Sequence, residues 1–164
     1  MDCIHVFVVA QAIFCGMSRM ITTVCNTILD TINFAATMAK TAKNGDIICL
    51  SGDLGAGKTV FAQGFAQGLK ISQQVNSPTF TLLREYTGET LTLYHFDLYR
   101  LCETTNKLDY DTLENIGFFD YLGIDGVCLI EWAEFAKDFI PKNAQWLNIT
   151  VTTNQAREIQ QLKP

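Results

Sequence analysis

The stretch "DIICLSGDLGAGKTVFAQGF", residues 46–65, decides the fold of this chain. It begins with a continuous apolar run, which is typical of a strand buried on both faces of a parallel sheet. It ends with Val60, Phe61 and Phe65 on one side of a helical pattern. Glycines at positions 52, 55 and 57 lie between, followed at once by Lys58 and Thr59. The sequence therefore predicts a strand, a flexible loop and a helix in succession.

The loop matches the pattern G-x-x-x-x-G-K-[ST] with Gly52, Gly57, Lys58 and Thr59. Glycines adopt positive φ readily, so successive N–H groups can point inward and surround anionic oxygens. The N-terminus of the following helix adds a partial positive charge. We expect Lys58 to reach the β- and γ-phosphates of a nucleotide and the Thr59 hydroxyl to ligate Mg²⁺. A glycine-rich turn without chemical function is the alternative, and the position between strand and helix speaks against it.

Two acidic residues end other apolar strands. Glu131 follows the run Val127–Ile130, and Asp97 follows "LYHF". Because ligands of open α/β sheets bind at the carboxyl ends of the strands, both acids are candidates to act on a phosphate-bound metal or a water. The alternative for each is an ordinary surface acid. We expect His95 to be a hydrogen-bonded structural residue rather than a base.

Composition limits the class of protein. The chain has 164 residues, of which 48% are hydrophobic and 18% charged, and a net charge of −5. This acidic balance argues against direct binding of a nucleic acid backbone, which draws on clustered Lys and Arg. We expect one domain over residues 20–164. Residues 1–19 are interpreted as an N-terminal extension, a start-site artefact with translation beginning at Met17 or Met20, rather than a membrane or packing segment.

The remaining patterns complete the predicted fold. A hairpin is expected from Phe80 to Phe96, with its turn at Thr87-Gly88, followed by short helices, a buried strand in "GVCLIEW" and a closing hairpin at residues 147–162. The six cysteines show no CxxC pair and are expected to be reduced, mostly buried thiols. The sequence thus predicts an α/β, three-layer P-loop NTPase-like fold with a mixed, mostly parallel central sheet.

Four stretches in this order resemble the bacterial TsaE (YjeE) family: GDLGAGKT (52–59), SPTF (77–80), YHFDLYRL (94–101) and LIEWAE (129–134). The resemblance implies a small, cytoplasmic P-loop ATPase that uses ATP/ADP and Mg²⁺. It implies a requirement for the threonylcarbamoyl modification of adenosine-37 in tRNAs that read ANN codons. It also implies TsaB and TsaD as partners, with tRNA reached indirectly through that complex and no contact with a membrane.

The resemblance also implies roles for single residues. Those that would hold the nucleotide are Asp53, Leu54, Gly55, Ala56, Gly57, Lys58, Thr59, Val60 and Trp132. Thr59 and Glu131 would contact Mg²⁺, Asp97 would be needed for hydrolysis together with Lys58, and Ser77-Pro78-Thr79 would form a mobile loop near the γ-phosphate. Residues near Asn26-Thr27 and Arg157 would touch the outer side of the nucleotide. Val60 departs from the family, which usually has a second threonine there, and so removes one hydroxyl near the phosphates.

Two other functions fit the same loop. A small-molecule kinase would commonly supply arginines that clamp the transferred phosphoryl group, and only three arginines follow residue 20: Arg84, Arg100 and Arg157. A nucleotide-binding switch without useful hydrolysis is the second alternative. A partner-dependent increase in phosphate release would favour the ATPase over the switch.

Overall fold

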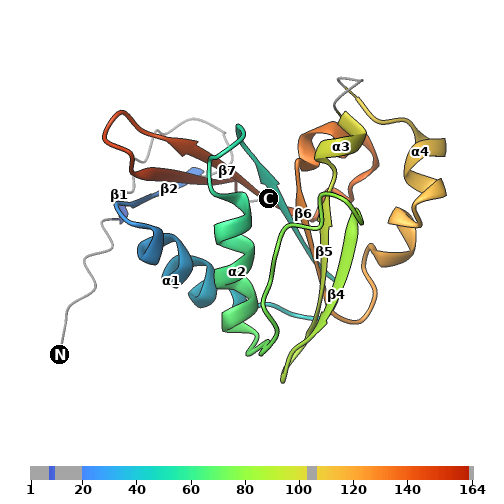
Figure 1. Ribbon diagram of the computed structural model, residues 1–164, viewed down its shortest axis with the longest axis horizontal. Helices are drawn as coiled ribbons and strands as arrows, with labels where there is room; N and C mark the ends of the chain where they lie inside the picture. The colour runs from blue at the N-terminus through green and yellow to red at the C-terminus, as the bar shows by residue number, and fades with distance from the viewer. Residues whose placement is uncertain (1–7, 10–19, 103–106, 163–164) are drawn as a thin grey trace.

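The computed structural model describes residues 8–9, 20–102 and 107–162 of the chain. Its strands are β1 Val8–Val9, β2 Met20–Cys25, β3 Asp46–Ser51, β4 Leu83–Thr87, β5 Thr92–Asp97, β6 Val127–Glu131, β7 Gln145–Val151 and β8 Arg157–Leu162. Its helices are α1 Ile28–Ala39, α2 Lys58–Gly68, α3 Tyr99–Cys102, α4 Tyr110–Asn115 and the 3₁₀ segments η1 Phe118–Tyr121 and η2 Ala133–Phe139. Figure 1 shows helices on both faces of the sheet that these strands form.

The described strands make one mixed sheet in the order β1-β2-β8-β7-β3-β6-β5-β4. The four central strands, β7, β3, β6 and β5, run parallel to one another. The flanking pairs are antiparallel, and both predicted hairpins form there, β4 with β5 and β7 with β8. The predicted mixed sheet with a mostly parallel centre is therefore confirmed.

The central strands bring the functional candidates to one edge. All five residues of β6 are buried, as are Ile47–Leu50 of β3, since neighbouring strands and helices cover them on every side. In the register of β5 and β6, Asp97 lies opposite Glu131. The glycine loop leaves β3 at the same carboxyl edge, because β3 and β6 are parallel with Leu50 opposite Glu131.

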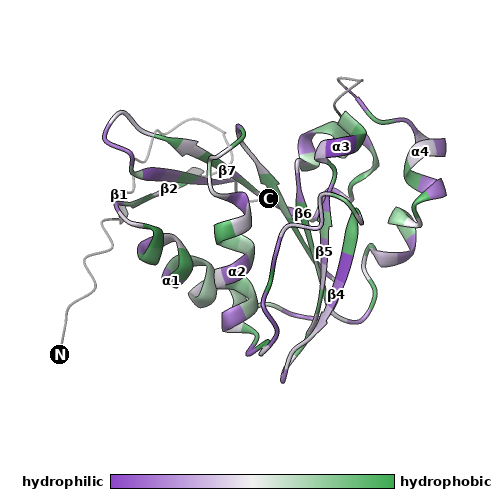
Figure 2. Cartoon of the chain, viewed as in Figure 1, coloured by the Kyte–Doolittle hydropathy of each residue, from purple (hydrophilic) through white to green (hydrophobic). Residues whose placement is uncertain are grey.

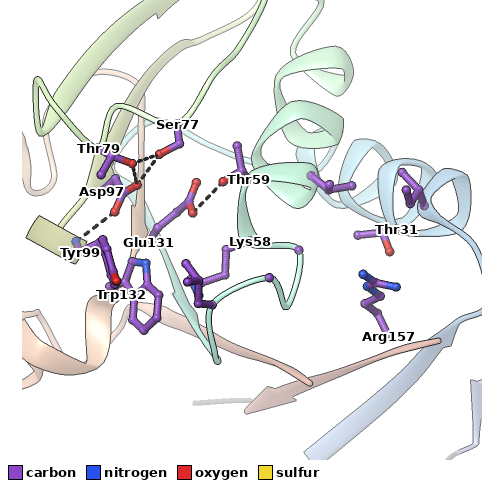
Figure 3. Close-up of a pocket in the computed structure, with 15 residues that line it drawn as sticks. Thr31, Lys58, Thr59, Ser77, Thr79, Asp97, Tyr99, Glu131, Trp132 and Arg157 are labelled. Atoms are coloured by element: carbon purple, nitrogen blue, oxygen red, sulfur yellow. Dashed lines mark hydrogen bonds between the residues drawn. The ribbon is translucent and has the colours of Figure 1, made fainter. Parts of the chain in front are cut away.

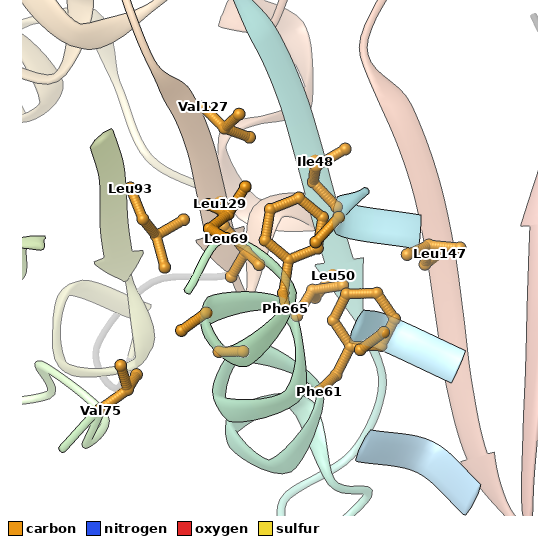
Figure 4. Packing of buried hydrophobic residues seen from close by; sticks show 14 of the residues in the cluster. Ile48, Leu50, Phe61, Phe65, Leu69, Val75, Leu93, Val127, Leu129 and Leu147 are labelled. Carbon is orange, nitrogen blue, oxygen red and sulfur yellow. The ribbon is translucent and has the colours of Figure 1, made fainter. Parts of the chain in front are cut away.

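Two separate apolar clusters fill the space on either side of the sheet. Under α1 and α2, Phe61 and Phe65 of α2 pack onto the sheet at Ile48 and Leu50 (Figure 4). On the opposite face, Phe96 and its neighbours pack against the α3, α4, η1 and η2 segments. Figure 2 shows apolar segments along α1, α2 and the central strands. The predicted three-layer α/β fold is confirmed.

One predicted boundary is wrong. The strand expected from Phe80 begins only at Leu83. The Leu82 N–H donates to the Pro78 carbonyl at 2.6 Å, and Leu82 takes a left-handed φ of 64°. Residues 79–82 therefore form a turn, on which the Phe80 side chain is 84% exposed.

The N-terminal segment and the cysteines can be followed only in part. Val8–Val9 pair with Thr22–Thr23 of β2, and the rest of residues 1–19 lies outside the described residues. No helix within the described ranges is long and apolar enough to cross a bilayer. Cys25, Cys49 and Cys128 are buried free thiols and Cys102 is a partly buried one, as expected, while Cys3 and Cys15 lie outside the description.

Candidate functional site

The glycine loop has the backbone geometry that the sequence predicts. Gly52, Gly55 and Gly57 all adopt positive φ, at 132°, 81° and 109°. Gly57 is the N-cap residue of α2, so the first N–H groups of that helix face the loop. A side chain at Gly52 would collide with the Ile149 carbonyl of β7, because Gly52 directly follows Ser51, which pairs with Asn148 of that strand. Position 52 therefore requires glycine for two reasons: its positive φ, and the lack of space for a Cβ beside the Ile149 carbonyl.

Lys58 lies folded back into the loop. Its Nζ donates to the Gly52 carbonyl at 2.5 Å and to the Asp53 carbonyl at 2.9 Å, and the side chain is 5% exposed. Burial lowers the pKa of the Lys58 ammonium, and four nearby carboxylates, Glu131 first, act in the opposite direction. The ammonium thus sits desolvated at the centre of the loop, where it would interact strongly with an anion.

Trp132 covers Lys58 from the other side. The lysine Nζ lies 3.6 Å from the centroid of the indole ring, which is a close cation–π contact. Trp132 directly follows β6 and takes a left-handed φ of 61°, a strained conformation for a bulky residue. This turn directs the indole toward the loop, and Tyr99 packs on it with ring centroids 5.1 Å apart.

Glu131 is held at both of its oxygens. The Thr59 hydroxyl donates to Oε2 at 3.1 Å, and Nε2 of His95 lies 2.9 Å from Oε1. Both Glu131 and His95 are buried, at 2% and 0% exposed. The acid that ends β6 and the Thr59 hydroxyl in the first turn of α2 therefore meet directly.

Asp97 also accepts hydrogen bonds at both of its carboxylate oxygens. Its Oδ2 accepts hydrogen bonds from the hydroxyls of Ser77 and Thr79, the latter at 2.7 Å, and its Oδ1 accepts from the Tyr99 N–H at 3.0 Å. The two hydroxyls come from the loop before β4, so this loop is tied to the end of β5 (Figure 3).

Glu134 is a third acid close to the loop. It lies in η2, and burial raises the pKa of its carboxyl, while Lys58 and the Gly52 backbone counteract this. Its Oε2 is buried without a hydrogen-bond partner among the described residues. Glu134 belongs to the stretch LIEWAE, but its sequence position alone predicts no role for it.

These groups surround one cavity of about 370 Å³. Figure 3 shows Asp97, Glu131 and Trp132 on one side of Lys58, and Thr31 and Arg157 on the other. The predicted site residues that line the cavity are Leu54, Gly55, Gly57, Lys58, Thr59, Val60, Asp97, Glu131 and Trp132. Of the other predicted residues, Ala56 is buried in the core at 1% exposed, and Asp53 contributes the carbonyl that holds Lys58.

The cavity lining also includes residues beyond those assigned from the sequence to the nucleotide, the metal or catalysis. Ser77, Thr79 and Arg157 had been implied by the family resemblance, and all three line the cavity. Ile28, directly after the implied Asn26-Thr27, lines it too, as do Thr31 and Tyr99, which were not predicted. Thr31 is 1% exposed with no partner for its hydroxyl within the described residues. A buried polar residue inside an apolar helical pattern was the one available signal for it.

The chain matches a known protein family. The sequence model of the family described as "Threonylcarbamoyl adenosine biosynthesis protein TsaE" matches residues 25–159. The chain belongs to the TsaE family. The match includes the phosphate loop and both strand-end acids, so the resemblance stated from four short stretches is confirmed over most of the chain.

Individual relatives extend this result. The chain is 42% identical over 130 residues to the tRNA threonylcarbamoyladenosine biosynthesis protein TsaE of Bacillus subtilis, covering 79% of this chain and 77% of the relative. It is 38% identical to the protein of the same name from Treponema pallidum, covering 79% and 91%. Among solved structures, the crystal structure of YdiB from Bacillus subtilis superimposes with a TM-score of 0.74 at 34% identity, covering 91% and 88% of the two chains.

Proposed function

We propose that this TsaE-family chain binds ATP with Mg²⁺ and hydrolyses it in support of threonylcarbamoyladenosine formation on tRNA, acting in the cytoplasm with TsaB and TsaD. The observation that carries the proposal is the meeting of four groups in one cavity: Lys58, Thr59, Glu131 and Asp97. The names of the relatives, which specify tRNA threonylcarbamoyladenosine biosynthesis, support the pathway.

The donor chemistry fits a magnesium nucleotide. Thr59 Oγ1 and Glu131 Oε2 are hard oxygen ligands 3.1 Å apart. Octahedral Mg²⁺ at about 2.0–2.1 Å from each ligand places neighbouring ligands about 3 Å apart, and it commonly takes one or two protein ligands plus phosphate oxygens. Lys58 and the left-handed glycines supply cationic and N–H donors beside that pair.

Each residue then has a defined task. When bound, magnesium ATP supplies the transferable phosphoryl group and neutralises charge on its oxygens. Lys58 would exchange the Gly52 and Asp53 carbonyls for phosphate oxygens, and Thr59 with Glu131 would hold the metal. Asp97 would orient the attacking water and accept its proton once Ser77 and Thr79 leave its Oδ2. Trp132 excludes solvent from Lys58.

The arginines favour an ATPase over a small-molecule kinase. Of those that the structure describes, Arg157 lines the cavity, while Arg100 stacks on the exposed Phe80 ring with its Cζ 5.2 Å from the centroid. Arg84 lies in β4 and is not a lining residue. The cluster of arginines that typically clamps a transferred phosphoryl group is thus missing from the described lining.

Phosphate release tests the proposal. It is measured for the chain alone and with TsaB, TsaD and tRNA, using the Lys58→Ala variant as the control for contaminating ATPase. A partner-dependent increase that the control lacks supports the proposal. An unchanged rate in every mixture, with nucleotide binding intact, would leave a nucleotide-binding switch instead.

A further inference from the structure

His95 is a buried polar side chain below the cavity that does not line it. It lies in β5 two residues before Asp97, so both side chains leave the same face of the sheet. Leu93, two residues earlier again, belongs to the apolar cluster under α2, which identifies that face. In the register His95 lies opposite Leu129, and its ring reaches forward along β6 to the Glu131 carboxylate.

The direction of this hydrogen bond follows from the chemistry of the two groups. An ionised carboxylate only accepts hydrogen bonds, so beside an ionised Glu131 the His95 proton has to lie on Nε2, 2.9 Å from Glu131 Oε1. The other ring nitrogen, Nδ1, has no partner within the described part of the chain. The histidine therefore makes one directed contact, and that contact is to Glu131.

Stability alone does not account for the pair. Burying a hydrogen-bonded polar pair among apolar side chains is often no more stabilising than apolar residues of similar volume. The carboxylate of an isolated glutamate, in contrast, rotates almost freely about its last torsion. With Oε1 held by His95, the other oxygen, Oε2, faces Thr59.

We infer that His95 is a positioning residue that fixes the rotation of the Glu131 carboxylate, so that Oε2 is presented with Thr59 Oγ1 as a preformed pair of ligands for Mg²⁺. The inference rests on the proposed function, because it assigns these two oxygens to the metal. Partners that orient a metal ligand typically contribute 10–100-fold to metal affinity. His95 itself touches neither the metal nor the nucleotide.

Three substitutions separate positioning from packing. His95→Leu fills the space without a donor. His95→Asn places an amide near the former Nδ1 position, away from Glu131, whereas His95→Gln extends an amide toward the former Nε2 position. The affinity for ADP is measured by calorimetry in EDTA and across a Mg²⁺ titration, with thermal unfolding as the check on folding.

We expect all three variants to bind ADP in EDTA within about twofold of the parent chain. The Mg²⁺ concentration needed for tightened binding should rise about 10–100-fold in His95→Leu and His95→Asn, and His95→Gln should recover most of the loss. Parent-like Mg²⁺ dependence in His95→Leu would overturn the inference while leaving the proposed function intact. If ADP binding to the parent chain does not change with Mg²⁺ concentration, both the inference and the proposed function are overturned.

A measurement on the unsubstituted side chain covers the case in which the variants do not fold. Long-range ¹H–¹⁵N spectra distinguish the two histidine tautomers, and His5→Gln identifies the His95 signals, since the chain has two histidines. The proton should lie on Nε2. A proton on Nδ1 alone would refute the inference, because such a ring cannot donate to Glu131.

Discussion

Gly64→Ala should destabilise the protein although alanine is the better helix former. Gly64 and Gly68 lie one turn apart in α2, on the side that faces α1. A Cβ built at Gly64 would lie 2.5 Å from the Ile32 carbonyl oxygen and 2.7 Å from the Ile32 Cα. At Gly68 it would collide with the Ala36 carbonyl and with the Ala39 Cβ. The glycines therefore set the distance between the two helices.

The magnitude follows from two opposing effects. Replacing glycine by alanine inside a helix gains about 1 kcal/mol of helix propensity. The Cβ at position 64 falls about 1 Å short of a normal van der Waals separation, and such overpacking costs about 1–3 kcal/mol. The upper end applies because the obstacle is the α1 backbone, which cannot rotate away. The net loss is about 2 kcal/mol, or about 4–8 °C in Tm for a chain of this length.

Thermal and urea unfolding of Gly64→Ala, Gly68→Ala and the double variant measure this effect. Gln67→Ala, at an exposed position of the same helix, is the matched control and should stay within about 0.5 kcal/mol of the parent chain. The double variant should lose less than the sum of the single variants, because moving the helices apart for one methyl group accommodates the other. A Gly64→Ala chain as stable as the parent would refute the close-contact reasoning.

Three further predictions concern the site. Lys58→Ala should weaken ATP binding at least tenfold in calorimetry, since each charge-assisted hydrogen bond contributes about 1.5–3 kcal/mol; parent-like affinity would contradict the role of the lysine. Asp97→Asn should retain ATP binding but lose about 10²–10⁴-fold in phosphate release, and a normal rate would remove Asp97 from the chemistry. Glu134→Gln should raise Tm at pH 8 and have little effect near pH 4. Burial raises the pKa of the Glu134 carboxyl in the folded state above its ordinary value of 4.5. Protonation of Glu134 therefore stabilises the folded state relative to the unfolded state below that value, and this stabilisation is lost as pH rises through the folded pKa. A Tm difference independent of pH would show that the carboxyl is not the cause.

The centre of the fold was predictable because its sequence pattern is unambiguous. In β6, four apolar residues are followed by an acid, and the apolar β3 is followed by a loop with three glycines. Both patterns are typical of buried parallel strands, whose carboxyl ends lie at one edge of the sheet. Glu131 and Asp97 could therefore be selected before their alignment across β6 and β5 was known. Their roles in catalysis and metal binding stay predictions.

Other features depended on contacts between distant segments. The apolar Phe80 was placed in a strand, but a turn closed by Pro78 and Leu82 exposes it, and the local pattern carries no sign of that turn. The glycines of α2 weaken the helix in isolation, and the close approach of α1 beside them explains their presence. The bond between His95 and Glu131 spans 36 positions of the sequence, so a spacing rule could not reveal it.

The contacts within the site bear on how tightly a nucleotide could bind. Lys58 is satisfied by two carbonyls and an indole ring, Thr59 by Glu131, and Asp97 by two hydroxyls and an N–H. A triphosphate gains only the difference between its own interactions with these groups and the internal ones that it displaces. Any partner that draws Ser77 and Thr79 away from Asp97 would free the carboxylate to accept a proton from water. Hydrolysis that depends on partners is therefore the behaviour expected of a site whose acid is already hydrogen-bonded on both oxygens.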